Sequence, residues 1–213
     1  MVSAARAKAE RRAQRDAFNA LGLTFWHGGA PGFEPGQQIV SPNRMGGLIA
    51  NIPIVPGYGE HPGREDRVYF TTDRELARAY AWRSALRPEA TGSLYRVIPV
   101  GIPEIDPDYA HHAEANLSFQ CAAIVIVAVE EAPVVMTQTE ATAAAGRYMT
   151  WDDGRPMYDS DGYFIPSTET LRNGLTHADA RRLWAPWTPY EAIVADSGRA
   201  QKYVEERSRQ DRH

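Results

Sequence analysis

A histidine–glycine pair and two tyrosines are the residues best suited to chemistry in this chain. His27 and Gly28 lie on an apolar run, and Tyr69 and Tyr80 follow with ten residues between them in VYFTTDRELARAYA. Tyr69 belongs to a short β-like run, whereas Tyr80 lies on an amphipathic helical segment. Such an arrangement can bring two aromatic faces to either side of one flat ring. The four residues therefore predict a site for a planar ligand.

Short elements with clear local signals must position these residues. Leu23–His27 predicts the first strand, and Val68–Thr71 predicts a second. Thr72 and Glu75 form a capping-box pattern, so a helix is expected to begin there and to run to about Leu86.

Two further strands are expected downstream. Leu94–Val100 reads as a strand, and Ser118–Val129 is strongly β, with a fully apolar part at Ala122–Val129. A fully apolar run of this kind is typical of a central strand covered on both faces.

A long Gly- and Pro-rich connection, Ser41–Arg67, separates the histidine from the first tyrosine. Connections of this length inside a compact domain are usually functional or mobile, so we expect it to border the site. Its charged end, Arg64–Arg67, suits either a position near a phosphate or a solvated turn.

Composition bounds the classes of function. The chain has 213 residues, 43% of them hydrophobic, and a net charge of −4, which allows a packed core and argues against nucleic-acid binding by bulk electrostatics. Cys121 is the only cysteine, which excludes an intramolecular disulfide and fits the cytoplasm. The longest apolar run is too short to span a membrane. The basic segment 1–20 lacks the apolar centre of a secretory signal and reads as a solvated helix. We expect a monomer.

The character of the chain changes after Pro133. Tyr148–Pro166 alternates aromatic residues with Asp-Gly turns, which predicts a hairpin. Thr176 with Asp179 predicts the start of a short helix. The last segment reads as a helix through Arg209, although its residues 192–195 also suit a strand. Trp184 and Trp187 suit either the core or a lid.

Four segments together resemble the rifamycin ADP-ribosyltransferases and, more distantly, the diphtheria-toxin and poly-ADP-ribose polymerase group. They are FWHGGAPGFEPGQQIVSP, RVYFTTDRELARAYA, GSLYRVIPVGIPEIDPDY and SFQCAAIVIVAVEE, in the family's order. The resemblance implies an α+β ADP-ribosyltransferase fold with two small, mostly antiparallel sheets, an NAD cleft and flanking helices. It divides the chain into an N-terminal helix (1–22), a core (23–136) and a C-terminal extension packed on the core (137–213).

The resemblance also implies a role for each residue of the site. His27 would form a hydrogen bond with a ribose hydroxyl, and the backbone of Gly28 would approach the nicotinamide carboxamide. Tyr69 would stack on the nicotinamide ring, with Tyr80 on its opposite side. Thr71 completes the expected NAD-binding set.

The third catalytic element has two candidates. Asp106 in EIDPDY matches the aspartate of the rifamycin enzymes, where it would stabilise the developing cation or orient the acceptor. The toxins and polymerases carry a glutamate at the start of a later strand, which corresponds here to Ser118–Gln120. That stretch has no acid, and Gln120 is the nearest polar candidate. The pair His111-His112 lacks further ligands at zinc spacing, so no metal is expected.

The implied activity is NAD-dependent mono-ADP-ribosylation, in which nicotinamide leaves and ADP-ribose passes to an acceptor. Cleavage of the nicotinamide–ribose bond passes through an oxocarbenium-like ribose, as in glycoside hydrolysis. The acceptor is a rifamycin-like small molecule, or a protein or nucleic acid as in bacterial or phage effectors. NAD would be a co-substrate. The alternatives are an NAD glycohydrolase, an RNA 2′-phosphotransferase and a non-catalytic binding module of the same fold.

Overall fold

The computed structural model describes residues 12, 19, 21–44, 66–83 and 92–210, which form two compact units, Met1–Val135 and Met136–His213. The predicted boundary lay after residue 136. Most of the predicted N-terminal helix and of the Ser41–Arg67 connection lies outside the described residues, as do Leu86 and Arg64.

The described part of the first unit is built on one antiparallel sheet of seven strands, in the order β2-β7-β4-β1-β3-β6-β5, with one α-helix and two 3-10 helices. The predicted α+β class is therefore confirmed. The elements are β1 (Phe25–Gly29), β2 (Gln38–Val40), η1 (Pro42–Arg44), β3 (Val68–Thr71), α2 (Arg74–Arg83), β4 (Ser93–Pro99), β5 (Glu104–Ile105), η2 (Pro107–Ala115), β6 (Ser118–Cys121) and β7 (Ala123–Glu131).

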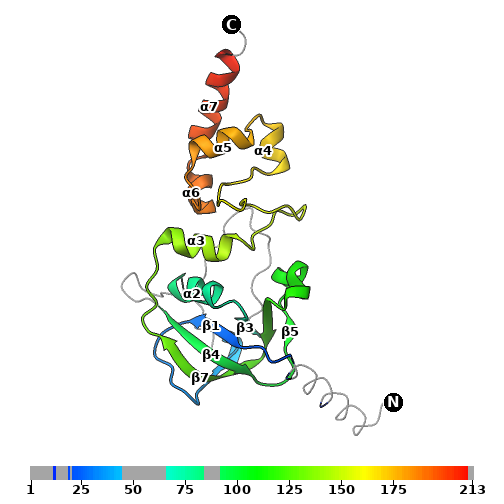
Figure 1. Ribbon diagram of the computed structural model, residues 1–213, viewed down its shortest axis with the longest axis vertical. Coiled ribbons are helices and arrows are strands. Elements are labelled where there is room, and N and C mark those ends of the chain that lie inside the picture. The colour runs from blue at the N-terminus through cyan, green and yellow to red at the C-terminus, as the bar shows by residue number, and fades with distance from the viewer. Residues whose placement is uncertain (1–11, 13–18, 20, 45–65, 84–91, 211–213) are drawn as a thin grey trace, which may run out of the picture. The chain divides into compact units, whose positions relative to one another are not determined.

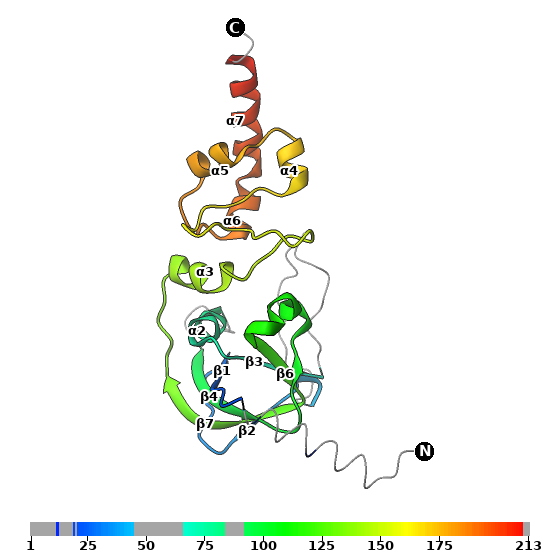
Figure 2. The ribbon, with the colours of Figure 1, turned by 45° about the vertical axis from the view of Figure 1, so that its right-hand side comes forward.

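The expectation of two separate sheets is wrong, because β1 joins both halves. β1 pairs with β4 along its whole length, from Phe25 to Gly29, but its register with β3 consists of Trp26 opposite Thr71. Figure 2 shows the sheet curled about this joint, with β4 and β7 on one side and β3 and β6 on the other. The sheet is continuous, and its weakest joint lies beside His27.

The two faces of the sheet differ in character. One face carries the apolar core, in which Phe25 packs edge-on against Phe70 (centroids 5.2 Å apart, 86° between planes) and against Phe119. Because side chains alternate along a strand, the residues between these face the other way. That opposite face is covered by α2, which lies over β1 in Figure 1.

The single strand expected over Ser118–Val129 is two strands. The chain breaks at Ala122, so that β6 pairs with β3 while β7 pairs with β4 and β2. β7 is also not covered on both faces, since Val127 and Val129 are 41% and 39% exposed. Apolarity alone did not reveal the break, because it depends on which strands the two segments pair with.

Helix α2 begins one residue later than its predicted cap implies. Asp73 caps it by accepting hydrogen bonds from the backbone N–H groups of Glu75 (2.8 Å) and Leu76 (3.1 Å). Thr72 instead donates its hydroxyl to the carbonyl of Asn116 at 2.8 Å. A carboxylate near the helix N-terminus also complements the helix dipole.

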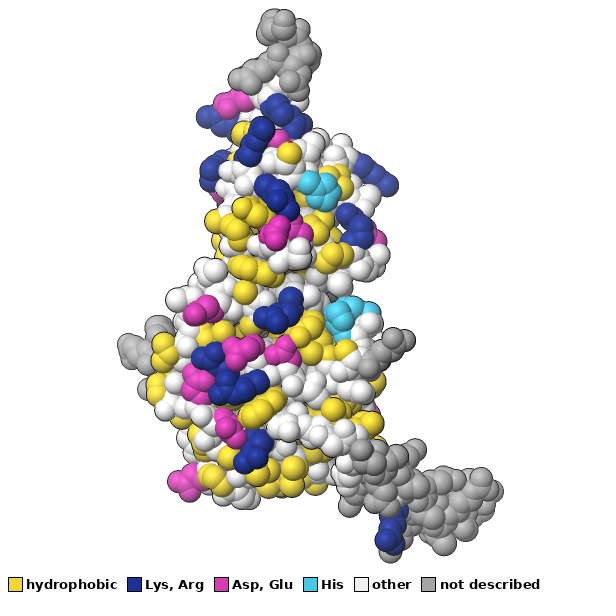
Figure 3. Space-filling view, viewed as in Figure 1, with side chains coloured by type: hydrophobic (Ala, Val, Ile, Leu, Met, Phe, Trp, Pro, Cys, Tyr) yellow, Lys and Arg dark blue, Asp and Glu magenta, His cyan; other side chains and the backbone are white. Residues whose placement is uncertain are grey.

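An ion-pair network ties α2 to the sheet. Arg78 donates to Glu131 of β7 through Nε at 2.7 Å and through a terminal nitrogen at 3.0 Å, and it pairs with Glu75 on its own helix. The hydrogen bond from Arg78 lowers the pKa of Glu131 and outweighs burial. On the face shown in Figure 3, basic and acidic side chains are intermingled over this unit.

The described part of the second unit is helical, with a tight aromatic core. The capping box of Thr176 and Asp179 is confirmed, and residues 192–195 are helical. The hairpin expected over Tyr148–Pro166 is reduced to two isolated bridges that flank the Asp-Gly turns. Its helices are α3 (Gln138–Gly146), α4 (Thr168–Arg172), α5 (His177–Leu183), α6 (Tyr190–Ala195) and α7 (Ser197–Gln210).

Candidate functional site

His27 spans the weak joint between β1 and β3 with its side chain. Its Nδ1 lies 2.8 Å from the backbone carbonyl oxygen of Tyr69. Because a carbonyl only accepts, Nδ1 must carry the hydrogen. Burial lowers the pKa of His27 more than this hydrogen bond raises it, so the ring is neutral at pH 7 with its lone pair on Nε2. The structure thus joins the His27 side chain to the backbone of Tyr69 and fixes the tautomer of the histidine. The two side chains lie on opposite faces of the sheet, since His27 shares the core face with Phe25 and Tyr95.

Gly28 turns its backbone groups toward the same joint. Thr72 donates its backbone N–H to the residue before β6 at 2.9 Å. Backbone groups of antiparallel strands point alternately to either side, so those of Tyr69 and Thr71 face β1. Trp26 lies opposite Thr71, and the N–H and C=O of Trp26 and Gly28 therefore face β3. The register between the two strands does not extend past Trp26 and Thr71, so the Gly28 amide and carbonyl face β3 beyond the paired residues.

Packing accounts for the glycine at position 28. A Cβ there would overlap the backbone of α2 at Ala77 and Ala81. Gly29 has a different neighbour, since a Cβ there would lie 2.6 Å from Nε2 of His27. The absent side chain of Gly28 thus allows α2 to sit directly on β1, whether or not a ligand binds.

Tyr69 and Tyr80 lie on the same side of the sheet. Tyr69 shares the face of Thr71 and Trp26, and α2, which carries Tyr80, covers that face. The side chain of Tyr80 is 42% exposed, yet its hydroxyl is enclosed and lies 2.6 Å from the hydroxyl of Tyr109. Burial of that hydroxyl raises the pKa of Tyr80, with Asp106 as a nearby contributor. The ring surface is therefore open, while the hydroxyl is anchored.

Asp106 is buried at the junction of β5 and η2. Its carboxylate accepts hydrogen bonds from the hydroxyl of Ser118 (2.8 Å) and from the backbone N–H of Asp108 (3.1 Å). Burial raises the pKa of Asp106, and these hydrogen bonds only partly oppose the change. Asp106 thus holds the start of η2 and lies near Tyr80.

Thr71 is less suited to a ligand than predicted. It is 4% exposed, and its hydroxyl donates to the carbonyl of Leu117 at 2.6 Å and accepts the backbone N–H of Asp73 at 3.0 Å. Both hydrogen-bonding directions of the hydroxyl are therefore used within the fold.

Gln120 lies in a row of side chains across three strands. The register places Tyr69 of β3 opposite Gln120 of β6, and Gln120 opposite Glu104 of β5. Gln120 donates from Nε2 to Glu104 at 3.3 Å, and Oε1 of Gln120 is buried without a hydrogen-bond partner. Asp106 shares this face, since it is bonded to Ser118, two residues before Gln120. Both candidates for the third element therefore lie side by side.

Glu104 was not predicted as a site residue from the sequence, and Arg67 was not distinguished from the charged segment that contains it. Arg67 is neither a solvated turn residue nor free for a phosphate. It pairs with Asp66 at 2.7 Å and with Glu104 at 3.2 Å, and its side chain is 19% exposed. Glu104 lies on a two-residue strand, too short for an alternating pattern to reveal. The lack of an acid near Gln120 was the signal that could have prompted a search on neighbouring strands.

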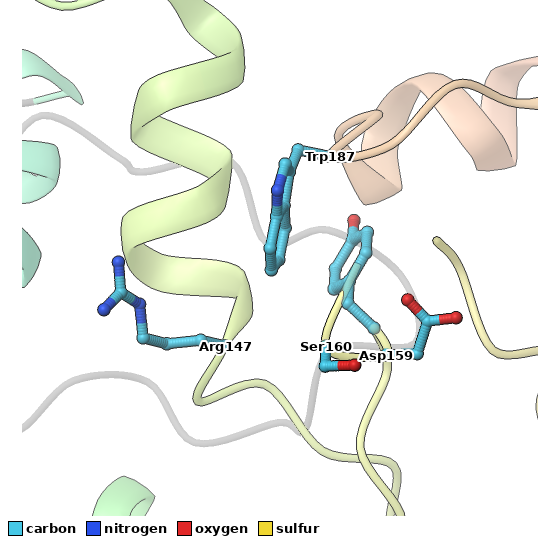
Figure 4. Close-up of a pocket in the computed structure, with 5 residues that line it drawn as sticks. Arg147, Asp159, Ser160 and Trp187 are labelled. Carbon is cyan, nitrogen blue, oxygen red and sulfur yellow. The ribbon is translucent and has the colours of Figure 1, made fainter. Parts of the chain in front are cut away.

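A hollow of about 390 Å³ lies within the second unit, and none of the predicted site residues lines it. Its walls include Arg147 and Trp187, both labelled in Figure 4, and Tyr158, whose ring centroid lies 5.6 Å from that of Trp187. The indole is wedged between Gly146 and Gly162, where added Cβ atoms would meet it. The indole of Trp187 therefore packs within the second unit, against Gly146, Gly162 and Tyr158, which leaves little of its ring face for stacking on a ligand.

The described residues contain no group of three or more His, Cys, Asp or Glu side chains placed to hold a metal ion. Within the same residues, no helix combines the length and the apolarity needed to cross a membrane. Compared with known protein families and with curated proteins, the sequence matches neither a family model nor a curated protein.

Proposed function

We propose that this protein is an NAD-dependent mono-ADP-ribosyltransferase. The observation that carries the proposal is the short β1–β3 pairing, whose register consists of Trp26 opposite Thr71. Beside it the His27 side chain is fixed to the backbone of Tyr69, and the N–H and C=O of Gly28 face β3 beyond the paired residues. A primary carboxamide needs one donor and one acceptor side by side, and the N–H and C=O of one residue in an extended strand supply both.

The reaction exchanges one bond at the ribose. The bond from C1′ to the nicotinamide nitrogen breaks, and its electron pair neutralises the ring. An acceptor hydroxyl then forms a C–O bond to C1′ and loses its proton to solvent. Nicotinamide is a good leaving group, so binding, orientation and stabilisation of the cationic ribose matter more than acid catalysis.

Each residue has a role that fits its surroundings. Nε2 of His27 accepts a hydrogen bond from a ribose hydroxyl, because Nδ1 holds the only ring hydrogen. Tyr69 and the open ring of Tyr80 flank the nicotinamide. Asp106, whose buried carboxylate is held by Ser118, stabilises the cationic ribose or orients the acceptor.

The architecture supports the same proposal. The sheet consists of four strands and three strands that meet at the weakly paired β1–β3 joint. In the single sheet observed, this joint is the place that corresponds to the boundary between the two small sheets that the resemblance implies. The segments FWHGGAPGF and RVYFTTDRELARAYA, which carry the resemblance to rifamycin ADP-ribosyltransferases, supply both sides of this joint.

Nicotinamide release from NAD by the full-length protein tests the proposal. We expect His27→Ala and Tyr69→Ala each to lower turnover at least tenfold while the protein stays folded, because each removes a contact to the dinucleotide. Tyr163→Ala, at a partly exposed tyrosine of the second unit, is the matched control.

Mass spectrometry of the products identifies the acceptor. An acceptor heavier by one ADP-ribose establishes transfer, with rifampicin as the first small molecule tried. Free ADP-ribose as the sole product identifies an NAD glycohydrolase. If the wild type neither binds NAD nor releases nicotinamide, the proposal is wrong and a binding module of this architecture remains.

A further inference from the structure

Among the buried polar atoms of the first unit that lack a hydrogen-bond partner within the described residues, two belong to side chains bonded to Glu104. They are Nε of Arg67, a donor, and Oε1 of Gln120, an acceptor. A terminal nitrogen of Arg67 and Nε2 of Gln120 reach the same carboxylate, at 3.2 and 3.3 Å. Buried polar groups are nearly always satisfied in folded proteins, so two orphans around one carboxylate require an explanation.

The three side chains occupy one face of the sheet. Gln120 lies between Tyr69 and Glu104 in the register. Arg67 precedes Tyr69 by two residues, so it points to the same face if the strand is continued. This face is the one that α2 covers and that carries Tyr69. The unsatisfied atoms are therefore neighbours of the candidate site.

Glu104 fixes the direction of the Gln120 amide. A carboxylate only accepts hydrogen bonds, so the amide must turn its NH₂ toward Glu104 and its oxygen away. Gln120 is 4% exposed, which leaves its oxygen little freedom to seek water. Glu104 is thus a positioning residue, since it sets which atom of Gln120 is offered to a ligand.

We propose that Arg67 and Gln120 bind a hydroxyl group of a ligand, with Glu104 as their common anchor. A hydroxyl donates one hydrogen bond and accepts others, so it satisfies Oε1 of Gln120 and Nε–H of Arg67 together. This inference rests on the proposed function. The hydroxyl comes either from a ribose of the dinucleotide or from the molecule that attacks C1′.

The test uses full-length protein with Arg67→Lys, which removes Nε–H and keeps the charge, and Gln120→Met, which removes Oε1 and keeps the length. Gln120→Met should melt close to the wild-type temperature, because removing the orphaned Oε1 offsets the lost hydrogen bond from Nε2 to Glu104, which stays paired with Arg67 and exposed. The control is Glu130→Gln, which removes a carboxylate paired with Arg96 on the β4–β7 side of the sheet.

Two measurements distinguish the source of the hydroxyl. If it is a ribose hydroxyl, both variants bind ADP-ribose about tenfold more weakly, while affinity for nicotinamide is unchanged. If it belongs to the attacking molecule, affinity for ADP-ribose is unchanged and nicotinamide release at saturating NAD falls about tenfold. Wild-type affinity and wild-type release in both variants would overturn the proposal.

Glu104 is tested by rescue. We expect Glu104→Leu to reproduce the loss seen with Gln120→Met, because the amide is no longer oriented. Glu104→Asp, which keeps the carboxylate, should recover part of it at an equal melting temperature. If the loss in both variants follows the melting temperature alone, Glu104 is structural. A wild type that does not bind NAD refutes the proposed function itself, which is a separate result.

Discussion

The two units satisfy their buried polar groups to different degrees. In the second unit, Tyr158 donates to the carbonyl of Thr188 (2.8 Å), and the indole of Trp184 donates to Asp196 (3.2 Å). No buried side-chain nitrogen or oxygen there lacks a partner within the described residues. In the first unit, Arg67 and Gln120 each retain one such atom.

We call the second unit closed because its buried polar side chains all have hydrogen-bond partners within the described residues. The first unit has buried polar atoms that a ligand could satisfy. Satisfied polar groups lower the free energy of the folded state, whereas an unsatisfied one costs about 1–3 kcal/mol. Natural proteins tolerate that cost where a ligand completes the hydrogen bonding. The contrast therefore supports the proposed site in the sheet unit, beside the short β1–β3 pairing.

The largest expected effect is in the second unit, at the ion pair of Arg207 and Asp179. Asp179 is 2% exposed and also accepts hydrogen bonds from Thr176. Arg207→Ala should lower the free energy of unfolding by about 3 kcal/mol, because the buried carboxylate of Asp179 would lose its cationic partner. Arg199→Ala, at an exposed pair, should cost under about 1 kcal/mol. Urea denaturation followed by tryptophan fluorescence measures both, and equal costs would contradict the closed second unit.

A matched pair of substitutions compares the units directly. Tyr158→Phe should cost about 1 kcal/mol of stability, because the Thr188 carbonyl loses its donor. Gln120→Met should cost little or stabilise the protein, because it removes the orphaned Oε1, and the carboxylate that loses the Nε2 hydrogen bond, Glu104, stays paired with Arg67 and exposed to solvent. Thermal and urea unfolding of the two variants provide the comparison. The contrast between the units fails if Gln120→Met is the more destabilising change.

The smallest effect concerns the dependence of stability on pH. The folded state lowers the pKa of His27 below its ordinary value of 6.5, so the unfolded chain binds a proton there more readily. The contribution of neutral His27 to the free energy of unfolding is therefore fully present above pH 6.5. It decreases as the pH falls from the pKa of His27 in the unfolded chain to its lower pKa in the folded protein. His27→Gln should reduce this decrease. Urea midpoints from pH 5 to 8 measure it, with His177→Gln, at an exposed histidine, as the control.

Local signals predicted local features well. The strand at 68–71 and the capping box of Thr176 with Asp179 were visible because their determinants lie within a few residues. The helix after Thr71 was also found, but Asp73 rather than Thr72 caps it, since the Thr72 hydroxyl is taken by Asn116. A local stretch of sequence around Thr72 does not show that its hydroxyl bonds to Asn116, which lies far along the chain.

Non-local pairing explains what the sequence could not reveal. Ala122 looks like part of one apolar strand, yet the chain changes partners there, from β3 to β4 and β2. Glu104 looks like a loop residue until the register sets it opposite Gln120. Of the candidate site, the sequence predicted His27, Tyr69, Asp106 and Gln120. Glu104, which bonds both Gln120 and Arg67, emerged only from the strand order.

The close seating of α2 on Gly28 also bears on how this protein would diverge. A related chain without the proposed NAD binding would still need glycine at position 28. Selection for a stable fold alone would remove any larger residue, because its Cβ would overlap the backbone of α2. The His-Gly pair is therefore a poor marker of activity among related chains. The Gln120 oxygen has no hydrogen-bond partner within the described residues, so selection for the fold alone would not retain it, and its retention is the better marker of the proposed site.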